Sequence, residues 1–185
     1  MYMKIFVAGA TGRVGEELIK NLVEKGHTVY AGARRDDAIE ANESVTPVHL
    51  DLHGTIDEIA NTLTDAEAVY FVAGSRGKDL LQTDLFGAVK LMQAVEKKGI
   101  KRYIHLSSLF ALQPDKWSGA LTDYNISKFF SDNWLIDKTN LEYTILQPGS
   151  LKETPGSGKI TTNITEKSEN SIENVAAVLT ELLEQ

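Results

Sequence analysis

Short apolar runs alternate with longer stretches of helical periodicity along this 185-residue chain. The runs are rich in β-branched and aromatic residues, which is typical of strands buried in a parallel sheet. We predict six strands, over Lys4–Ala8, His27–Ala33, Val45–Leu50, Ala68–Ala73, Arg102–Leu106 and Leu141–Leu146.

Between these runs, apolar residues recur at helical spacing and predict helices with one buried face. A long helix is expected after Asp79, which has the side chain of a good N-cap. Near the end of the chain, we expect a small edge strand over Lys159–Thr162 and a last helix that begins at Ser171. Strands alternating with helices predict a doubly wound parallel α/β sheet. The core stripe of the long helix is predicted to be Leu81, Leu85, Ala88, Met92 and Val95.

Three glycines directly follow the first predicted strand and precede a helical stripe. Gly9 allows a tight turn, Gly12 lets the backbone approach a pyrophosphate, and Gly15 lets the helix pack closely on the sheet. The free N–H groups and positive dipole end of the helix then suit phosphate. A purely structural turn is the alternative. In this context the pattern predicts dinucleotide binding through Gly9, Thr11, Gly12, Arg13, Val14 and Gly15.

Two arginines, Arg34 and Arg35, follow the second predicted strand. An acidic residue at this strand end suits the ribose 2′-hydroxyl of NAD, whereas arginine suits the 2′-phosphate of NADP. Asp36 and Asp37 come too late in the chain for the acidic role. A solvated charged turn is the alternative, but the position favours NADP (NADPH) over NAD. Arg13, a cation at a helix start, is easier to explain if it meets an anion.

Composition and charge narrow the choice of partners. The formal net charge of −7 and the pI near 5.1 argue against nucleic acid and against anionic membranes as partners. The absence of cysteine excludes disulfides, thiolate metal sites and cysteine nucleophiles. The four histidines show no metal-ligand spacing, so we expect no metal site. The first strand opens the chain without a leader, and no apolar run approaches the ~20 residues of a membrane span. We therefore expect a cytoplasmic protein that acts on a small-molecule substrate.

The turn G-A-T-G-R-V-G over residues 9–15 resembles that of the short-chain dehydrogenase/reductase superfamily. More narrowly, it resembles the atypical NAD(P)H-binding branch: NmrA-like proteins, small flavin and biliverdin reductases, and bacterial NAD(P)H-binding oxidoreductases. The resemblance implies a single NAD(P)-binding domain of the Rossmann type over residues 1–185. It also implies that Asp51 and Leu52 lie beside the adenine, for which a strand-end turn is the alternative. Ala73 and Gly74, at the carboxyl end of a central strand, are expected to line the cofactor cleft.

The same resemblance assigns roles near the fifth strand and the helix after it. Tyr124 is the expected proton donor to a carbonyl, and Lys128 is expected to hold the nicotinamide ribose and to lower the pKa of the tyrosine. Their four-residue spacing places both on one helix face. Ser108 is an expected substrate contact, and Ser107 and Pro148 are expected cofactor contacts; ordinary strand-end residues are the alternative.

Two positions depart from the family pattern. Asp84 stands where many relatives have the asparagine of N-x-x-G, and Gln147 stands where relatives have the arginine of R-P-G. Both departures keep open a non-catalytic NADP(H)-sensing protein of the NmrA-like kind. We predict an NADPH-dependent oxidoreductase that transfers hydride to a small or planar acceptor (a quinone, flavin or carbonyl compound). The 37 residues after Pro148 are expected to be too few for the substrate domain of sugar-nucleotide epimerases. Leu109–Leu121 is the expected substrate-side loop.

Overall fold

The fold is built on one six-stranded parallel sheet with the strand order β3-β2-β1-β4-β5-β6. The computed structural model describes residues 2–162 and 164–184. All six predicted strands are confirmed, with ends that differ by at most two residues. They are β1 (Lys4–Ala8), β2 (Thr28–Ala33), β3 (Val45–His49), β4 (Ala68–Phe71), β5 (Arg102–Leu106) and β6 (Glu142–Leu146).

The centre of the sheet lies at β1 and β4, which pair in parallel with Ile5 opposite Ala68. Residues 5–8 and 68–71 are fully buried, because helices cover both faces of the sheet. After β3 the chain crosses to the other side of β1, so the strand order reverses between β1 and β4. A crevice forms at the carboxyl ends of the strands at such a reversal, and ligands bind there in folds of this type.

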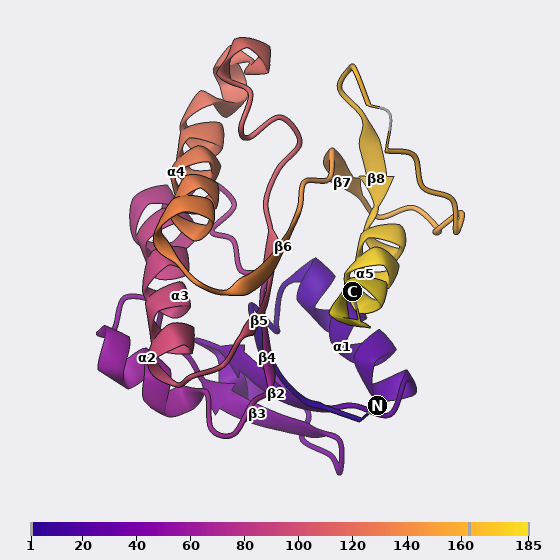
Figure 1. Ribbon diagram of the computed structural model, residues 1–185. Helices are drawn as coiled ribbons and strands as arrows, with labels where there is room; N and C mark the ends of the chain where they lie inside the picture. The colour runs from indigo at the N-terminus through magenta and orange to yellow at the C-terminus, as the bar shows by residue number, and fades with distance from the viewer. Residues whose placement is uncertain (1, 163, 185) are drawn as a thin grey trace.

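Two helix layers enclose the sheet (Figure 1). On one face α1 (Arg13–Glu24) packs against α5 (Ile172–Glu181), which begins after Ser171 as predicted. On the other face lie α2 (Ile56–Thr62), α3 (Ala88–Lys97) and α4 (Thr122–Lys138). Each layer has its own apolar core against the sheet. None of the helices among the described residues is long and apolar enough to cross a membrane.

The start of the long helix after Asp79 differs from the prediction. Residues Leu80–Gly87 form a π-helical segment that leads into α3. Its i→i+5 hydrogen bonds turn side chains away from their α-helical directions. Leu81, predicted to belong to the core, is therefore 71% exposed, while the carboxylate of Asp84 is fully buried. Asp79 precedes the segment as predicted, but its side chain does not cap the helix.

The segment between β6 and α5 also corrects the prediction. Lys159–Thr162 form no strand; instead β7 (Ser150–Lys152) pairs in parallel with β8 (Glu169–Ser171). The backbone N–H groups of Gly156 and Gly158 donate to side chains in the first turn of α5, at 2.6 and 3.0 Å. At the start of the predicted strand, the Lys159 amide donates to Ser157 Oγ at 3.2 Å and its carbonyl accepts from Asn174 Nδ2 at 3.4 Å, so both groups bond to side chains rather than to a neighbouring strand.

Candidate functional site

The turn between β1 and α1 is held by two very close backbone approaches. Gly9 has a φ of +102°, and a Cβ built on it would lie 2.5 Å from the Ala73 amide nitrogen. A Cβ built on Gly15 would lie 2.1 Å from the Gly9 carbonyl oxygen. The glycines therefore have a steric role in the fold, whichever ligand the turn binds. No side chain caps the N-terminus of α1, so its first N–H groups stay available to a ligand.

This turn separates two cavities that together form one cleft. The β2-side cavity, of about 570 Å³, lies over the ends of β1, β2 and β3, and the β5-side cavity, of about 390 Å³, lies over the ends of β4, β5 and β6. Because the two cavities share five lining residues, we treat them as one continuous cleft across the crevice. The shared residues are Gly12, Val72, Ala73, Gly74 and Arg76.

The cleft brings together nearly all of the residues singled out from the sequence. Among the predicted cofactor-binding and catalytic residues, Gly15 alone lines neither cavity, because it packs against the backbone of the turn. The β2-side cavity is lined by Gly9, Thr11, Gly12, Arg34, Arg35, Asp51, Leu52, Ala73 and Gly74. The β5-side cavity is lined by Gly12, Arg13, Val14, Ala73, Gly74, Ser107, Ser108, Tyr124, Lys128 and Pro148.

Arg34 and Arg35, at the end of β2, line the β2-side cavity, whereas Asp36, the next residue in the chain, does not. Asp36 lies outside the cavity, and its Oδ1 is 3.1 Å from His49 Nδ1. The acidic side chains that do line this cavity are Asp51 and Asp79, which follow β3 and β4. The position after β2, where an acid selects the ribose hydroxyl, is therefore cationic.

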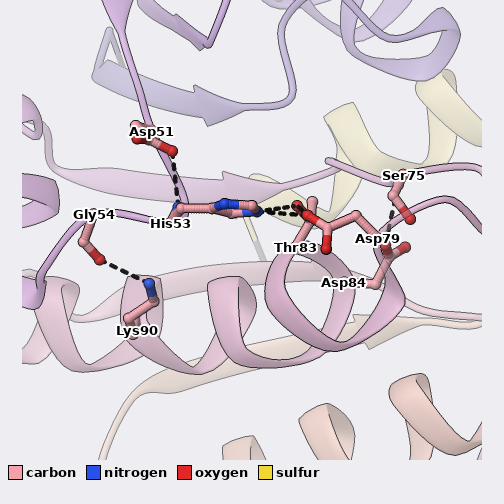
Figure 2. Close-up of polar contacts among 8 residues, drawn as sticks. All are labelled: Asp51, His53, Gly54, Ser75, Asp79, Thr83, Asp84 and Lys90. Atoms are coloured by element: carbon pink, nitrogen blue, oxygen red, sulfur yellow. Dashed lines mark hydrogen bonds and ion pairs between the residues drawn. The ribbon is translucent and has the colours of Figure 1, made fainter.

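Asp79 connects two loops at the rim of this cavity (Figure 2). Its Oδ2 lies 2.5 Å from His53 Nε2 and accepts a hydrogen bond from Thr83 Oγ1 at 2.6 Å. The His53 amide in turn donates to Asp51 Oδ1 at 2.9 Å. Hydrogen bonds from Thr83 and His53, with the nearby charge of Arg34, lower the pKa of Asp79. The side chain expected to cap a helix instead links the loop after β3 to the loop after β4.

In the β5-side cavity, Tyr124 and Lys128 lie on one face of α4, as their spacing predicts. Lys128 is 3% exposed; its Nζ donates to the Leu106 carbonyl at 3.3 Å and lies 5.7 Å from the centre of the Tyr124 ring. Burial lowers the pKa of Lys128, while the carboxylates of Asp84 and Asp132 act to raise it.

The expected lowering of the Tyr124 pKa by Lys128 is not found. Burial, reinforced by the negative charges of Asp84 and Asp132, raises the pKa of Tyr124 to about 12. The phenol is half-buried in the wall of the cavity, and two carboxylates oppose its ionisation. Tyr124 is therefore fully protonated at neutral pH, which is the state that a proton donor needs.

Asp132 joins β5, β6 and α4 beneath the cavity. Its Oδ2 accepts hydrogen bonds from Ser107 Oγ at 2.6 Å and from Gln147 Nε2 at 3.1 Å, and its Oδ1 lies 3.4 Å from His105 Nε2. Ser107 is thus turned toward Asp132, so its hydroxyl is already engaged. Gln147, which departs from the family pattern, anchors the turn after β6 through this carboxylate.

Comparison with known proteins identifies the family of this chain. A family model described as NAD(P)H-binding matches residues 9–185. The chain belongs to this NAD(P)H-binding family. It is an atypical, epimerase-like member of the short-chain dehydrogenase/reductase group with a Rossmann-type fold.

Three relatives illustrate the family. The oxidoreductase ylbE from Lactococcus lactis is 47% identical, with a TM-score of 0.94 over 98% of this chain and 85% of that one. A putative NAD-dependent epimerase/dehydratase from Bacillus halodurans is 32% identical, with a TM-score of 0.88 over 99% of this chain and 88% of that one. The uncharacterized sugar epimerase YhfK of Bacillus subtilis is 33% identical over 165 residues, covering 85% of this chain and 77% of that protein.

The cleft fits the dinucleotide that this NAD(P)H-binding family takes. Ser75 Oγ is buried at the β2-side cavity and has no hydrogen-bond partner among the described residues. A buried hydroxyl without a partner is costly, and a polar ligand removes that cost. The uncapped N-terminus of α1 supplies further backbone donors to the cleft. Residues 9–15 and Ser75 are therefore suited to the phosphates and sugars of the dinucleotide.

Several polar residues of the site have no local signal in the sequence. Asp132 is separated from Ser107 by 25 positions, and its role depends on how α4 packs on β5. Lys167 and Ser168 line the β5-side cavity although they come from the segment between β7 and β8. Their position follows from the path of the chain after β6 rather than from any motif.

We expect acid to destabilise this fold through two buried histidines. Burial lowers the pKa of His105 and of His27 below the ordinary value of 6.5, although Asp132 partly opposes this for His105. Below about pH 6.5 the unfolded chain binds protons that the folded chain does not, so stability falls as pH falls. The loss approaches about 1.4 kcal/mol per pH unit for each proton, measurable by urea unfolding between about pH 7.5 and about pH 5.

His105→Phe provides the matched comparison, because the His105 ring already stacks on Phe71 at 5.1 Å. This variant is expected to lose less stability than the parent over the same pH range. An equal loss in both proteins would show that His105 does not contribute to acid sensitivity.

Proposed function

We propose that this protein is an NADPH-dependent oxidoreductase that reduces a small or planar acceptor, such as a carbonyl compound or quinone. The observation that carries the proposal is the continuity of the cleft. The cleft runs from the glycine turn and Arg34 at one end to Tyr124 and Lys128 at the other. A dinucleotide with its phosphates on the turn extends toward the pair of side chains suited to proton transfer.

The residues of the β5-side cavity have different roles in the proposed reduction. When bound, the reduced nicotinamide supplies the hydride. Tyr124, protonated at neutral pH, donates a proton to the acceptor oxygen, and Ser108 offers a hydroxyl to the same oxygen. Lys128 holds the ribose, and Asp84 and Asp132 favour its charged form. Leu109 and Phe110 line the acceptor side of the cavity.

The preference for NADPH rests on the two arginines after β2. An Arg34→Ala/Arg35→Ala variant is expected to bind NADPH about 10- to 100-fold more weakly, because charge-assisted hydrogen bonds to the 2′-phosphate are lost. Binding of NADH, which lacks that phosphate, is expected to change less than about threefold. Titration calorimetry with each cofactor measures both effects, and Lys138→Ala, an exposed substitution outside the cleft, is the control.

Two results would count against this assignment. Tighter binding of NADH than of NADPH by the parent protein would contradict the cofactor preference. An equal loss of affinity for NADPH and NADH in the double variant would mean that the arginines support the fold of the cleft and do not select the 2′-phosphate.

A non-catalytic NADP(H)-sensing protein is the second candidate. The departures at Asp84 and Gln147 favour it, since both replace residues of the catalytic pattern. Retention of Tyr124 and Lys128 at one end of the cleft favours catalysis. Oxidation of NADPH in the presence of carbonyl, quinone and flavin acceptors distinguishes the two, because a sensor binds NADPH without consuming it.

A further inference from the structure

The β5-side cavity is lined by more basic than acidic residues. The chain as a whole has 26 acidic and 19 basic residues. The cavity reverses this balance, because Asp84 is its one carboxylate lining residue among the residues that the structure describes. Its basic lining residues are Arg13, Arg76, Lys116, Lys128 and Lys167.

Two of these basic residues, Lys128 and Arg13, interact with carboxylates, and a third, Arg76, also lines the β2-side cavity. Lys128 is buried and interacts with the charges of Asp84 and Asp132. Arg13 pairs with Glu153 at 3.3 Å, and Arg76 lines both cavities. Lys116 and Lys167 remain. Both line the β5-side cavity only, and neither forms an ion pair within residues 2–162 and 164–184.

Lys116 is held in place by its surroundings. Its Nζ lies 4.4 Å from the centre of the Phe110 ring, and Phe110 is buried with a φ of +62°. The indole N–H of Trp117 donates to the Phe110 carbonyl at 2.9 Å, and the Trp117 ring packs edge-on against Phe129 of α4. The loop after β5 is therefore anchored to α4, with Lys116 at the wall of the cavity.

Ser168 adds an observation of a different kind. Its Oγ is buried and lacks a hydrogen-bond partner among the described residues, although Ser168 also lines the cavity. It follows Lys167 directly and packs against Gly149, where a built Cβ would lie 2.6 Å from that oxygen. An unpaired hydroxyl that lines the same cavity as two cations is suited to an anionic ligand atom.

From this we infer that the acceptor carries an acidic group, a carboxylate or phosphate, which Lys116, Lys167 and Ser168 bind in the β5-side cavity. The inference rests on the proposed oxidoreductase function and narrows its acceptor class. Two lysine charges attract such a molecule into the cleft. Anchoring its acidic end then holds its reducible end near Tyr124.

A set of matched ligands tests the inference without turnover. Benzoate, phenyl phosphate and the neutral analogue benzamide are titrated by calorimetry into protein saturated with NADP+. We expect one or both anions to bind at least about tenfold more tightly than benzamide, as charge-assisted hydrogen bonds predict. The better of the two anions identifies the acidic group.

The Lys116→Met/Lys167→Met variant is expected to lose this preference. Lys98→Met/Lys138→Met, which removes two exposed lysines outside the cleft, has the same net charge and is expected to keep it. The inference would be overturned if the parent protein bound benzamide as tightly as the anions. It would also be overturned if both double variants lost the preference for anions to the same extent.

Turnover separates the inference from the proposed function. 4-Carboxybenzaldehyde and 4-formylphenyl phosphate are compared with the methyl ester of the former. We expect a higher kcat/KM for an acidic aldehyde, by about tenfold or more, and no such difference in the Lys116→Met/Lys167→Met protein. Comparable turnover of the ester would overturn the inference that the acceptor is acidic, and it would leave the proposed oxidoreductase activity supported. Anion binding without oxidation of NADPH by any acceptor would contradict the oxidoreductase and retain the anion site.

Discussion

Replacing Tyr124 by phenylalanine is expected to lower kcat for a carbonyl acceptor by about 100- to 10,000-fold, the usual contribution of a positioned general acid. The phenol is the protonated group that lines the β5-side cavity beside Lys128. Without the phenol oxygen, the alkoxide that develops on the acceptor loses the proton donor positioned to protonate it. The ring itself is retained, so the packing around α4 should change little.

Steady-state kinetics and cofactor titration together check this result. NADPH binding by Tyr124→Phe is expected to stay within about threefold of the parent, since the lost group acts on the acceptor. Tyr143→Phe removes the hydroxyl of an exposed tyrosine on β6 and serves as the control. Lys128→Ala is expected instead to weaken NADPH binding. Unchanged kcat in Tyr124→Phe would mean that reduction needs no proton from this residue, as for a flavin acceptor.

Gly15→Ala is expected to destabilise the protein by at least about 3 kcal/mol, at the upper end of the cost of overpacking. The added Cβ would lie 2.1 Å from the Gly9 carbonyl oxygen and 3.1 Å from the Ala10 Cα. Both contacts are with backbone, so no side-chain rotation relieves them. The β1–α1 turn must open, and NADPH binding should be lost with it.

Urea unfolding measures this effect, with Gly119→Ala as the control. A Cβ on Gly119 meets no described atom within 4 Å, and its backbone does not have a positive φ. That variant is expected to stay within about 0.5 kcal/mol of the parent. A Gly15→Ala protein with the parent's unfolding midpoint would show that the turn can relax without loss, contrary to its close packing here.

The two halves of the cleft have different structural origins. The β2-side cavity is built from strand ends and the turns that directly follow them, such as Gly9 and Arg34. The β5-side cavity adds Lys116 and Lys167, from the loop after β5 and from the segment before β8. We therefore expect recognition of the cofactor to depend on the sheet itself. We expect the acceptor class to depend on the two added segments, which can change without disturbing the strand order.

Local features of the sequence were enough to predict the sheet and to single out residues that line the β2-side cavity. Buried parallel strands need continuous apolar runs, so β1 to β6 are visible as short stretches between polar segments. The spacing of the glycines is equally local, and Gly15 meets the backbone of Gly9 and Ala10 within the same strand–turn–helix unit. The close approach of Gly9 to Ala73, in contrast, depends on the pairing of β1 with β4. The spacing of Tyr124 and Lys128 places both on one helix face without reference to the rest of the chain.

Tertiary structure alone decided the features that depend on distant partners. The π-helical segment packs against Leu52 and α4, and it buries Asp84 and exposes Leu81 contrary to the simple apolar spacing. The pKa of Tyr124 rises rather than falls, because burial and two carboxylates act on it together. Lys116 and Lys167 are 51 positions apart in sequence and still line one cavity. Burial and charge depend on everything packed around a group, and residue spacing records only its neighbours along the chain.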